Sequence, residues 1–337
     1  MRVALGVVSG LLMSAAFGPV ATVAGQNGAD TAEAHVARAK AAADDTYQNL
    51  FTFLCAAPGA RGGAPRAGAP RAGGPAGAAA RGGGGGPAVP DRSSWYVEPV
   101  RVFDNLLFVG QSEYTAWAIT TSDGIILIDA LFDYAVEEAV VGGLKKLGAD
   151  PASIKYVVVT HPHPDHHGGA RFLQERYGAR VIMSAADWDV IDGLSGNKPA
   201  RDLVAVDGQA LTLGDTTVTL HVTPGHTPGT ISPVFSVRDG GQPHTVAMWG
   251  GTGLNADRAS LEQYVASAKR FAGLARAAGA DVLLSNHTDW DGSKVHLRQL
   301  ASRAPGGPHP SVVGAEGVRR YLEVAEACAT ARLRRLP

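Results

Sequence analysis

Short apolar runs separated by glycine and aspartate dominate the chain from residue 95 onward. Runs of this length and composition predict β-strands, and longer stretches with apolar residues every three or four positions predict helices. Several of these stretches end at a glycine, as helices commonly do. We expect strands at residues 106–109, 115–120, 125–129, 155–160, 180–183, 217–222, 245–249 and 281–284. We expect helices at residues 132–147, 169–177, 260–278, 295–302 and 317–333.

The order of these elements predicts an α/β (α+β) fold. Strands followed by helices occur twice along the chain, which indicates two mixed sheets packed face to face with helices outside. With 337 residues, 45% of them hydrophobic, the chain is long enough to bury a full-sized core. Thirty basic and 31 acidic residues give a formal charge of −1. This near-neutral charge disfavours a nucleic-acid partner.

The amino-terminal part differs from the rest in composition. Residues 1–25 combine Arg2, an apolar stretch and small residues, a pattern typical of a cleaved export signal. The alternative is a membrane anchor, but glycines and serines dilute the apolar stretch, so we expect no stable span after cleavage and a periplasmic or secreted protein. Residues 26–55 predict a helix, and the glycine-, alanine-, proline- and arginine-rich residues 56–92 predict a disordered linker. The main domain is then residues 93–337.

The chain has two cysteines, Cys55 and Cys328, on opposite sides of that linker. Two cysteines exclude a disulfide framework or a cysteine-rich zinc module. In an oxidising compartment this pair would be able to clip the amino-terminal helix to the carboxy-terminal one. The sequence alone leaves open whether the two residues lie close enough to pair.

A cluster of histidines follows the predicted strand 155–160. The segment from His161 to Gly169 reads HPHPDHHGG, and imidazole and carboxylate groups are ligands that Zn²⁺ prefers. His161 and His163 are placed to face one metal ion, and Asp165 and His166 to face a second. The alternative is a histidine-rich surface loop, which the position at a strand end and the two prolines disfavour.

Two metal sites of this kind need further ligands from elsewhere in the chain. His226 lies in the loop TPGHTPGT after the strand 217–222, and His287 follows the strand 281–284. Each alone would be an ordinary loop histidine. Together with the first cluster, they are candidates to complete two metal sites.

These motifs resemble the metallo-β-lactamase-fold superfamily, from roughly Val100 to the carboxyl terminus. The resemblance implies a four-layer αβ/βα sandwich and two Zn²⁺ ions. It places His161, His163 and His226 at the first ion and Asp165, His166 and His287 at the second. Glyoxalase II and the lactonases of this superfamily carry a bridging aspartate near residues 248–252, and two lactamase subclasses carry a cysteine ligand there. This chain has neither, which is similar to subclass B3 metallo-β-lactamases.

The resemblance implies a dinuclear zinc hydrolase in which a metal-bound hydroxide opens a cyclic amide, a β-lactam. Asp165 would bind one ion and orient the nucleophile. Asp129 is expected to hold a ligand imidazole, or alternatively to cap a turn. The serines that hold the drug carboxylate in B3 enzymes have no evident match here, and Thr252 and Asn255 are the nearest candidates. We expect Trp249, Thr252 and Trp290, with the 111–115 loop, to line the groove for a small-molecule substrate.

Other functions stay open at this point. A metal-dependent lactonase or esterase of the same fold would use the same ligands, and an iron-dependent sulfur dioxygenase shares the fold. The superfamily's nucleases are disfavoured by the neutral charge and by the predicted export. A non-catalytic zinc-binding exported protein would need a metal site closed to water, whereas each predicted ion has three protein ligands. The oligomeric state is not predicted.

Overall fold

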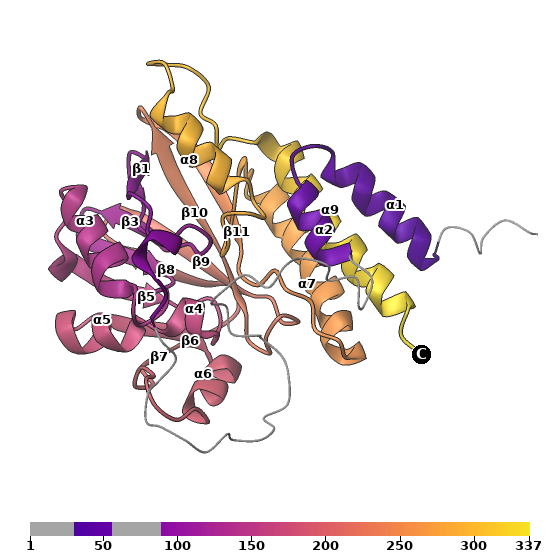
Figure 1. The fold of residues 1–337 in the computed structure, drawn as a ribbon, viewed down its shortest axis with the longest axis horizontal. Helices are drawn as coiled ribbons and strands as arrows, with labels where there is room; N and C mark the ends of the chain where they lie inside the picture. The colour runs from indigo at the N-terminus through magenta and orange to yellow at the C-terminus, as the bar shows by residue number, and fades with distance from the viewer. Residues whose placement is uncertain (1–29, 56–88) are drawn as a thin grey trace, which may run out of the picture.

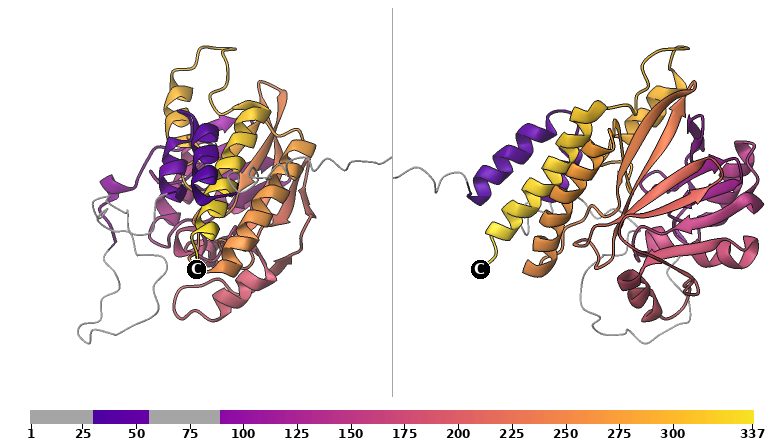
Figure 2. Two further views of the ribbon diagram at one scale, coloured as in Figure 1. Left: turned by 90° about the vertical axis from the view of Figure 1, so that its right-hand side faces the viewer. Right: turned by 180° about the vertical axis from the view of Figure 1, so that it is seen from behind.

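The computed structural model describes residues 30–55 and 89–337. The predicted export signal and almost all of the predicted linker lie outside the described residues. Within those residues, the chain forms two sheets with helices on both outer sides (Figure 1). Seen from behind, the two sheets stack with one helical layer on each side (Figure 2), so the predicted four-layer αβ/βα sandwich is confirmed.

The first sheet has seven strands in chain order. Its first four strands are antiparallel, and β4 to β7 are parallel, so the carboxyl ends of β4, β5 and β6 lie at one edge. The strands are β1 (Val100–Phe103), β2 (Leu106–Phe108), β3 (Trp117–Thr121), β4 (Gly124–Ile128), β5 (Ile154–Val158), β6 (Arg180–Ser184) and β7 (Leu203–Ala205).

The second sheet has five strands in the order β12-β11-β10-β9-β8. Its central strand, β10, was not predicted, because Pro233 and two serines interrupt its apolar pattern. The short strands β1, β7 and β8 were also missed. The strands are β8 (Gln209–Leu213), β9 (Thr216–Val222), β10 (Ile231–Asp239), β11 (Gln242–Trp249) and β12 (Val282–Ser285).

The helices form the two outer layers. The predicted helix over residues 132–147 is a π-helix (Val136–Gly142) followed by α3. The helices are α1 (Ala32–Ala43), α2 (Gln48–Cys55), α3 (Gly143–Lys146), α4 (Pro164–His167), α5 (Ala170–Tyr177), α6 (Ala185–Asp192), α7 (Arg258–Ala277), α8 (Ser293–Ala301) and α9 (Gly314–Arg334). Two short 3₁₀ helices cover Arg92–Ser94 and Pro151–Ser153.

The core lies mainly between the two sheets. Leu106, Phe108 and Trp117 from the first sheet meet Phe235 and Met248 from the second, and all five side chains are almost fully buried. Burying apolar side chains on both inner faces is the main favourable contribution to such a stack. Two further apolar clusters fix the helices to the outer faces of the sheets.

The amino-terminal segment forms two helices, so the prediction of a single helix is wrong. Asp44 ends α1 with a positive φ of 46°, which breaks the helical path before α2 begins. Both helices pack against α9, and a disulfide bond joins Cys55 of α2 to Cys328 of α9. Tertiary packing thus brings together two cysteines that are 273 residues apart.

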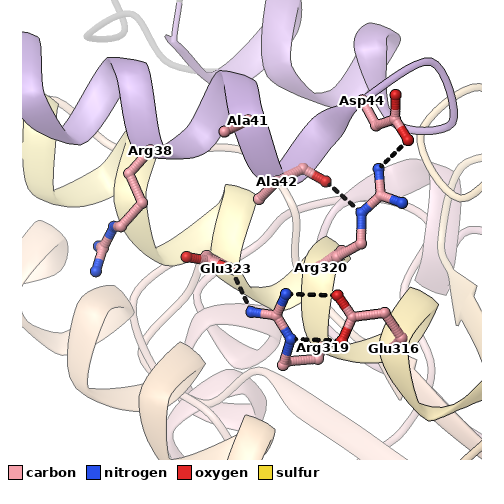
Figure 3. Close-up of a pocket in the computed structure, with 8 residues that line it drawn as sticks. All are labelled: Arg38, Ala41, Ala42, Asp44, Glu316, Arg319, Arg320 and Glu323. Carbon is pink, nitrogen blue, oxygen red and sulfur yellow. Dashed lines mark hydrogen bonds and ion pairs between the residues drawn. The ribbon is translucent and has the colours of Figure 1, made fainter.

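Charged side chains line a groove between α1 and α9 (Figure 3). Arg319 pairs with Glu316 and Glu323, and Arg320 pairs with Asp44 of α1 at 3.1 Å. The two Arg319 pairs lie within α9, whereas the Arg320–Asp44 pair joins α9 to the end of α1 and helps to hold the amino-terminal helices in place. None of the helices in the described parts of the chain is long and apolar enough to cross a membrane.

Candidate metal centre

Three histidines from two loops form the first cluster. His161 follows β5, His163 precedes α4, and His226 lies in the loop between β9 and β10. His226 Nε2 lies 3.1 Å from His161 Nε2 and 3.2 Å from His163 Nδ1. Three imidazole nitrogens at this spacing, within 4.8 Å of one another, form a possible three-coordinate metal site.

Asp165, His166 and His287 form the second cluster. Asp165 Oδ2 lies 3.0 Å from His166 Nε2 and 3.7 Å from His287 Nε2. Asp165 and His166 belong to the short helix α4, and His287 follows β12. The ring centres of His161 and His166 are 4.1 Å apart, so the two clusters adjoin. The structure therefore brings together all six side chains that the sequence predicted as ligands.

Glycines allow the loop of His226 to approach its neighbours. Gly225 has a φ of 134°, and a Cβ there would lie 2.5 Å from the backbone of Tyr264. A Cβ on Gly251 would lie 2.6 Å from the Cβ of His226. A side chain at Gly251 would displace His226 itself, and one at Gly225 would push the loop of His226 away from α7, which explains why glycines stand at these two positions.

Backbone carbonyls set the orientation of two of the histidines. His161 Nδ1 donates to the carbonyl oxygen of Gly250 at 2.8 Å, and His226 Nδ1 donates to that of Gly253 at 2.7 Å. Because a carbonyl oxygen only accepts, Nδ1 carries the proton in both rings. The lone pair of each neutral ring is then on Nε2, which faces the cluster.

Asp129 links chain segments that carry ligands of both clusters. Its buried carboxylate accepts hydrogen bonds from the backbone N–H of Thr160 at 2.8 Å, from Asn286 Nδ2 at 2.7 Å and from His166 Nδ1 at 3.0 Å. These partners are at least 31 residues away in sequence, so Asp129 holds distant segments together rather than capping a local turn. Its positive φ of 62° shows that the surrounding contacts hold it in a strained conformation.

The donor set fits a borderline divalent metal ion. Burial, followed by the charges of neighbouring histidines, lowers the pKa of His226 and His287 to about 3, which keeps both rings neutral and able to bind a cation. His166 Nε2 is fully buried and makes no hydrogen bond, although Asp165 lies beside it. A buried nitrogen without a hydrogen-bond partner is costly, and a cation between these groups would satisfy it.

Comparisons with known proteins agree with this geometry. Residues 109–241 match the family model described as "Metallo-beta-lactamase superfamily". The chain contains a metallo-β-lactamase superfamily domain. This superfamily is one of metallo-hydrolases, and the metallo-β-lactamases and hydroxyacylglutathione hydrolases to which the chain is similar are both hydrolases.

The structural similarity extends beyond the matched residues. BJP-1, a subclass B3 metallo-β-lactamase of Bradyrhizobium japonicum, is 27% identical with a TM-score of 0.58, over 68% of this chain and 91% of that chain. A metallo-β-lactamase of Cronobacter sakazakii, the HARLDQ motif mutant S60, is 27% identical with a TM-score of 0.60, over 72% and 97% of the two chains. The domain is therefore similar in structure to B3 enzymes.

Curated sequences that match carry a different description. The hydroxyacylglutathione hydrolase of Acidiphilium cryptum is 32% identical over 120 residues, which is 36% of this chain and 44% of that protein. The protein of the same name from Chelativorans sp. is 30% identical over 120 residues, or 36% and 43%. The chain thus spans less than half the length of these relatives.

The structure corrects part of the predicted substrate groove. Trp249 is buried in the core, where its Nε1 donates to Tyr264 at 3.0 Å, so it does not line a groove. Thr252 is buried against Tyr321, at 3.4 Å between the two hydroxyl oxygens. Asn255 donates to the carbonyls of Gly225 and His226 and thereby supports the ligand loop. Trp249 and Thr252 do not face the histidines, because β11 and the turn after it place these side chains against α7 and α9.

Trp290 does lie beside the centre. Its ring centre is 4.0 Å from that of His287. The ring centre of Tyr114, in the predicted 111–115 loop, is 5.1 Å from that of His287, and the ring centre of Phe132 is 5.1 Å from that of Tyr114. The sequence did not single out Phe132, because an aromatic residue at the start of a helix is ordinarily part of the core.

Asp187 is a supporting residue that the sequence analysis missed. Its carboxylate accepts hydrogen bonds from Thr227 Oγ1 at 2.8 Å and from the backbone N–H of Gly229 at 2.9 Å, both in the loop that carries His226. Its own N–H donates to the N-cap Ser184. The Ser-x-x-Asp spacing predicts a helix start and would have placed Asp187 there, but it carries no information about the distant loop.

Asp187 should make stability depend on pH. Burial raises the pKa of its carboxyl to about 7, from the ordinary value of 3.8. Since the unfolded chain releases this proton at lower pH, the free energy of unfolding should fall as pH rises from about 4 to about 7. In chelator-treated protein, we expect Asp187→Asn to show a smaller drop in melting temperature between pH 4.5 and 7.5 than the unchanged protein. If the melting temperature fell equally in the two proteins, the Asp187 carboxyl would not be the source of this pH dependence.

Proposed function

We propose that this protein is an exported dizinc hydrolase that opens β-lactam rings, similar to subclass B3 enzymes. The observation that carries the proposal is the pair of adjoining ligand clusters, three histidines beside Asp165, His166 and His287. The similarity to BJP-1 supports it, because that protein is described as a subclass B3 metallo-β-lactamase.

The residues around the clusters also disfavour a bridging carboxylate. A Cβ on Gly250 would lie 1.7 Å from the carbonyl oxygen of Ile231, and a Cβ on Gly251 would collide with His226. No side chain, and so no aspartate, fits at either position without displacing its neighbours. This argues for the B3-like ligand set over that of the superfamily members with a bridging aspartate.

The chain's own residues supply binding and orientation. His161, His163 and His226 would hold one ion, and Asp165, His166 and His287 the other. Bound Zn²⁺ supplies Lewis acidity toward a substrate carbonyl and a source of hydroxide near neutral pH. Carbonyl oxygens orient His161 and His226, and the Asp129 carboxylate orients His166, so the ligands need little rearrangement to bind.

A second candidate reaction is thioester hydrolysis. The similarity to the hydroxyacylglutathione hydrolases favours it, since 32% identity is shared over 120 residues. The absence of a bridging carboxylate disfavours it, and we therefore rank it second to β-lactam hydrolysis.

Export to the periplasm or beyond is part of the proposal. Disulfide bonds persist in oxidising compartments, and Cys55 and Cys328 are joined by one. The signal-like composition of residues 1–25 supports the same destination.

A substrate panel with and without a chelator tests the proposed reaction. We expect nitrocefin hydrolysis by the purified protein, loss of that activity after chelation and its return with added Zn²⁺, with about two Zn²⁺ per chain by metal analysis. A glutathione thioester and an acyl-homoserine lactone serve as the alternative substrates. Hydrolysis of either without any turnover of β-lactams would overturn the β-lactam assignment, and unchanged activity after complete metal removal would overturn the metal mechanism.

A further inference from the structure

We propose that Phe53 and Trp290 form an apolar subsite next to His287 that binds an aromatic substituent of the substrate. This inference rests on the proposed β-lactam hydrolysis, because it concerns the group attached to the reacting ring. It assigns a binding role to the amino-terminal helix α2, which carries none of the predicted metal ligands.

The rings form a continuous stack that ends at a candidate ligand. Phe53 lies on Trp290 with ring centres 4.3 Å apart and planes inclined by 18°, and Trp290 lies 4.0 Å from the ring of His287. Trp290 is half-buried, whereas Phe53 is 38% exposed. The stack therefore runs from a candidate metal ligand to a ring that is partly open to solvent.

A second aromatic pair also lies next to His287. Tyr114 lies 5.1 Å from the His287 ring in an edge-on arrangement, and it is backed by Phe132. Both side chains are half-buried. A substrate whose carbonyl reaches the polar centre would therefore lie near aromatic rings from separate segments of the chain, and aromatic groups pair well with such surfaces.

A single exposed phenylalanine would need no explanation by itself. Phe53 differs from such a residue because apolar packing and a disulfide bond both hold α2 in place. Leu50 and Leu54 bury the neighbouring face of α2 against the helical layer, and Cys55, two residues later, is bonded to Cys328. A rigidly held aromatic ring loses little entropy on binding, which suits it to a recognition role.

Two penicillins that differ in one group test the proposal. Benzylpenicillin carries an aromatic side chain, and 6-aminopenicillanic acid has the same bicyclic ring without it. We expect Phe53→Ala to raise KM for benzylpenicillin by about three- to tenfold, the size of one aromatic contact, with kcat little changed. KM for 6-aminopenicillanic acid should stay within about twofold, and Phe53→Trp should restore the value for benzylpenicillin.

Controls separate a local effect from a structural one. Val190, an exposed apolar residue on α6, provides a matched truncation, and Val190→Ala should change neither substrate. The melting temperature of each variant reports whether the fold is kept. Equal changes for both penicillins in Phe53→Ala, or no change for either, would overturn the subsite.

A binding measurement keeps the subsite testable even if the protein hydrolyses no β-lactam. Phenylacetylglycine carries the same aromatic group, and saturation-transfer NMR would detect its contact with the unchanged protein. We expect a signal on the phenyl protons that is strongly reduced in Phe53→Ala and retained in Val190→Ala. Failure of hydrolysis with this pattern would refute the proposed function alone, whereas no phenyl signal or an unchanged one in Phe53→Ala would refute the subsite.

Discussion

The variant His226→Ala is expected to lose metal-dependent hydrolysis, with kcat/KM lower by about a thousandfold or more. His226 Nε2 lies within 3.2 Å of the ligating nitrogens of both His161 and His163, so its removal leaves the first cluster with two nitrogens. We expect metal analysis to show at least one ion fewer per chain. Activity on nitrocefin and metal content would be measured on the same preparation.

A histidine outside the centre provides the control for this variant. His35 lies on α1, where its ring pairs with Asp30, and His35→Ala should keep both activity and metal content. Circular dichroism would show that both variants keep the fold. Full turnover by His226→Ala on every substrate of the panel would refute the metal centre.

The variant Asp129→Asn is expected to weaken metal binding by about 10- to 100-fold, although Asp129 is not itself a predicted ligand. The change keeps the shape of the side chain but replaces one accepting oxygen with a donating NH₂ group. Asn286 Nδ2 and His166 Nδ1 approach Oδ2 at 2.7 and 3.0 Å, and the Thr160 N–H approaches Oδ1 at 2.8 Å. Whichever position the NH₂ group takes, at least one donor would face another donor. Leaving a buried donor unpaired should also lower the free energy of unfolding by about 1–3 kcal/mol.

Competition with a chromophoric chelator measures the metal affinity, and urea unfolding measures the stability. Asp133 follows the same strand but is exposed, and Asp133→Asn serves as the matched control with neither effect. If Asp129→Asn bound metal as tightly as the unchanged protein, the carboxylate would not be what orients His166.

Much of the candidate site could be predicted from sequence because its chemistry is local. Two prolines and the end of a buried strand place His161, His163, Asp165 and His166 on one short segment. The loop of His226 was predictable because glycine and proline restrict its path. Such signals depend on neighbours along the chain, and the packing of the two sheets then brings together the loops that follow β5, β9 and β12.

The groove was predicted less well, since it depends on which way a side chain faces. Trp249 and Thr252 flank Gly250 and Gly251, of which the second packs on His226, yet both side chains pack inward on α7 and α9. Strand β10 was missed because its pairing with β9 and β11 stabilises residues whose own pattern is weak.

The amino-acid sequence by itself determined which side chains carry metal-binding chemistry, the loops that present them and the class of fold that supports those loops. Only the tertiary structure decided that Cys55 meets Cys328, that Asp187 supports the loop of His226, and that Phe53 reaches Trp290. The physical reason is the range of the interactions. Strand and turn preferences act over a few residues, whereas these three contacts join segments between 40 and 273 residues apart and form only when α2 and α6 pack.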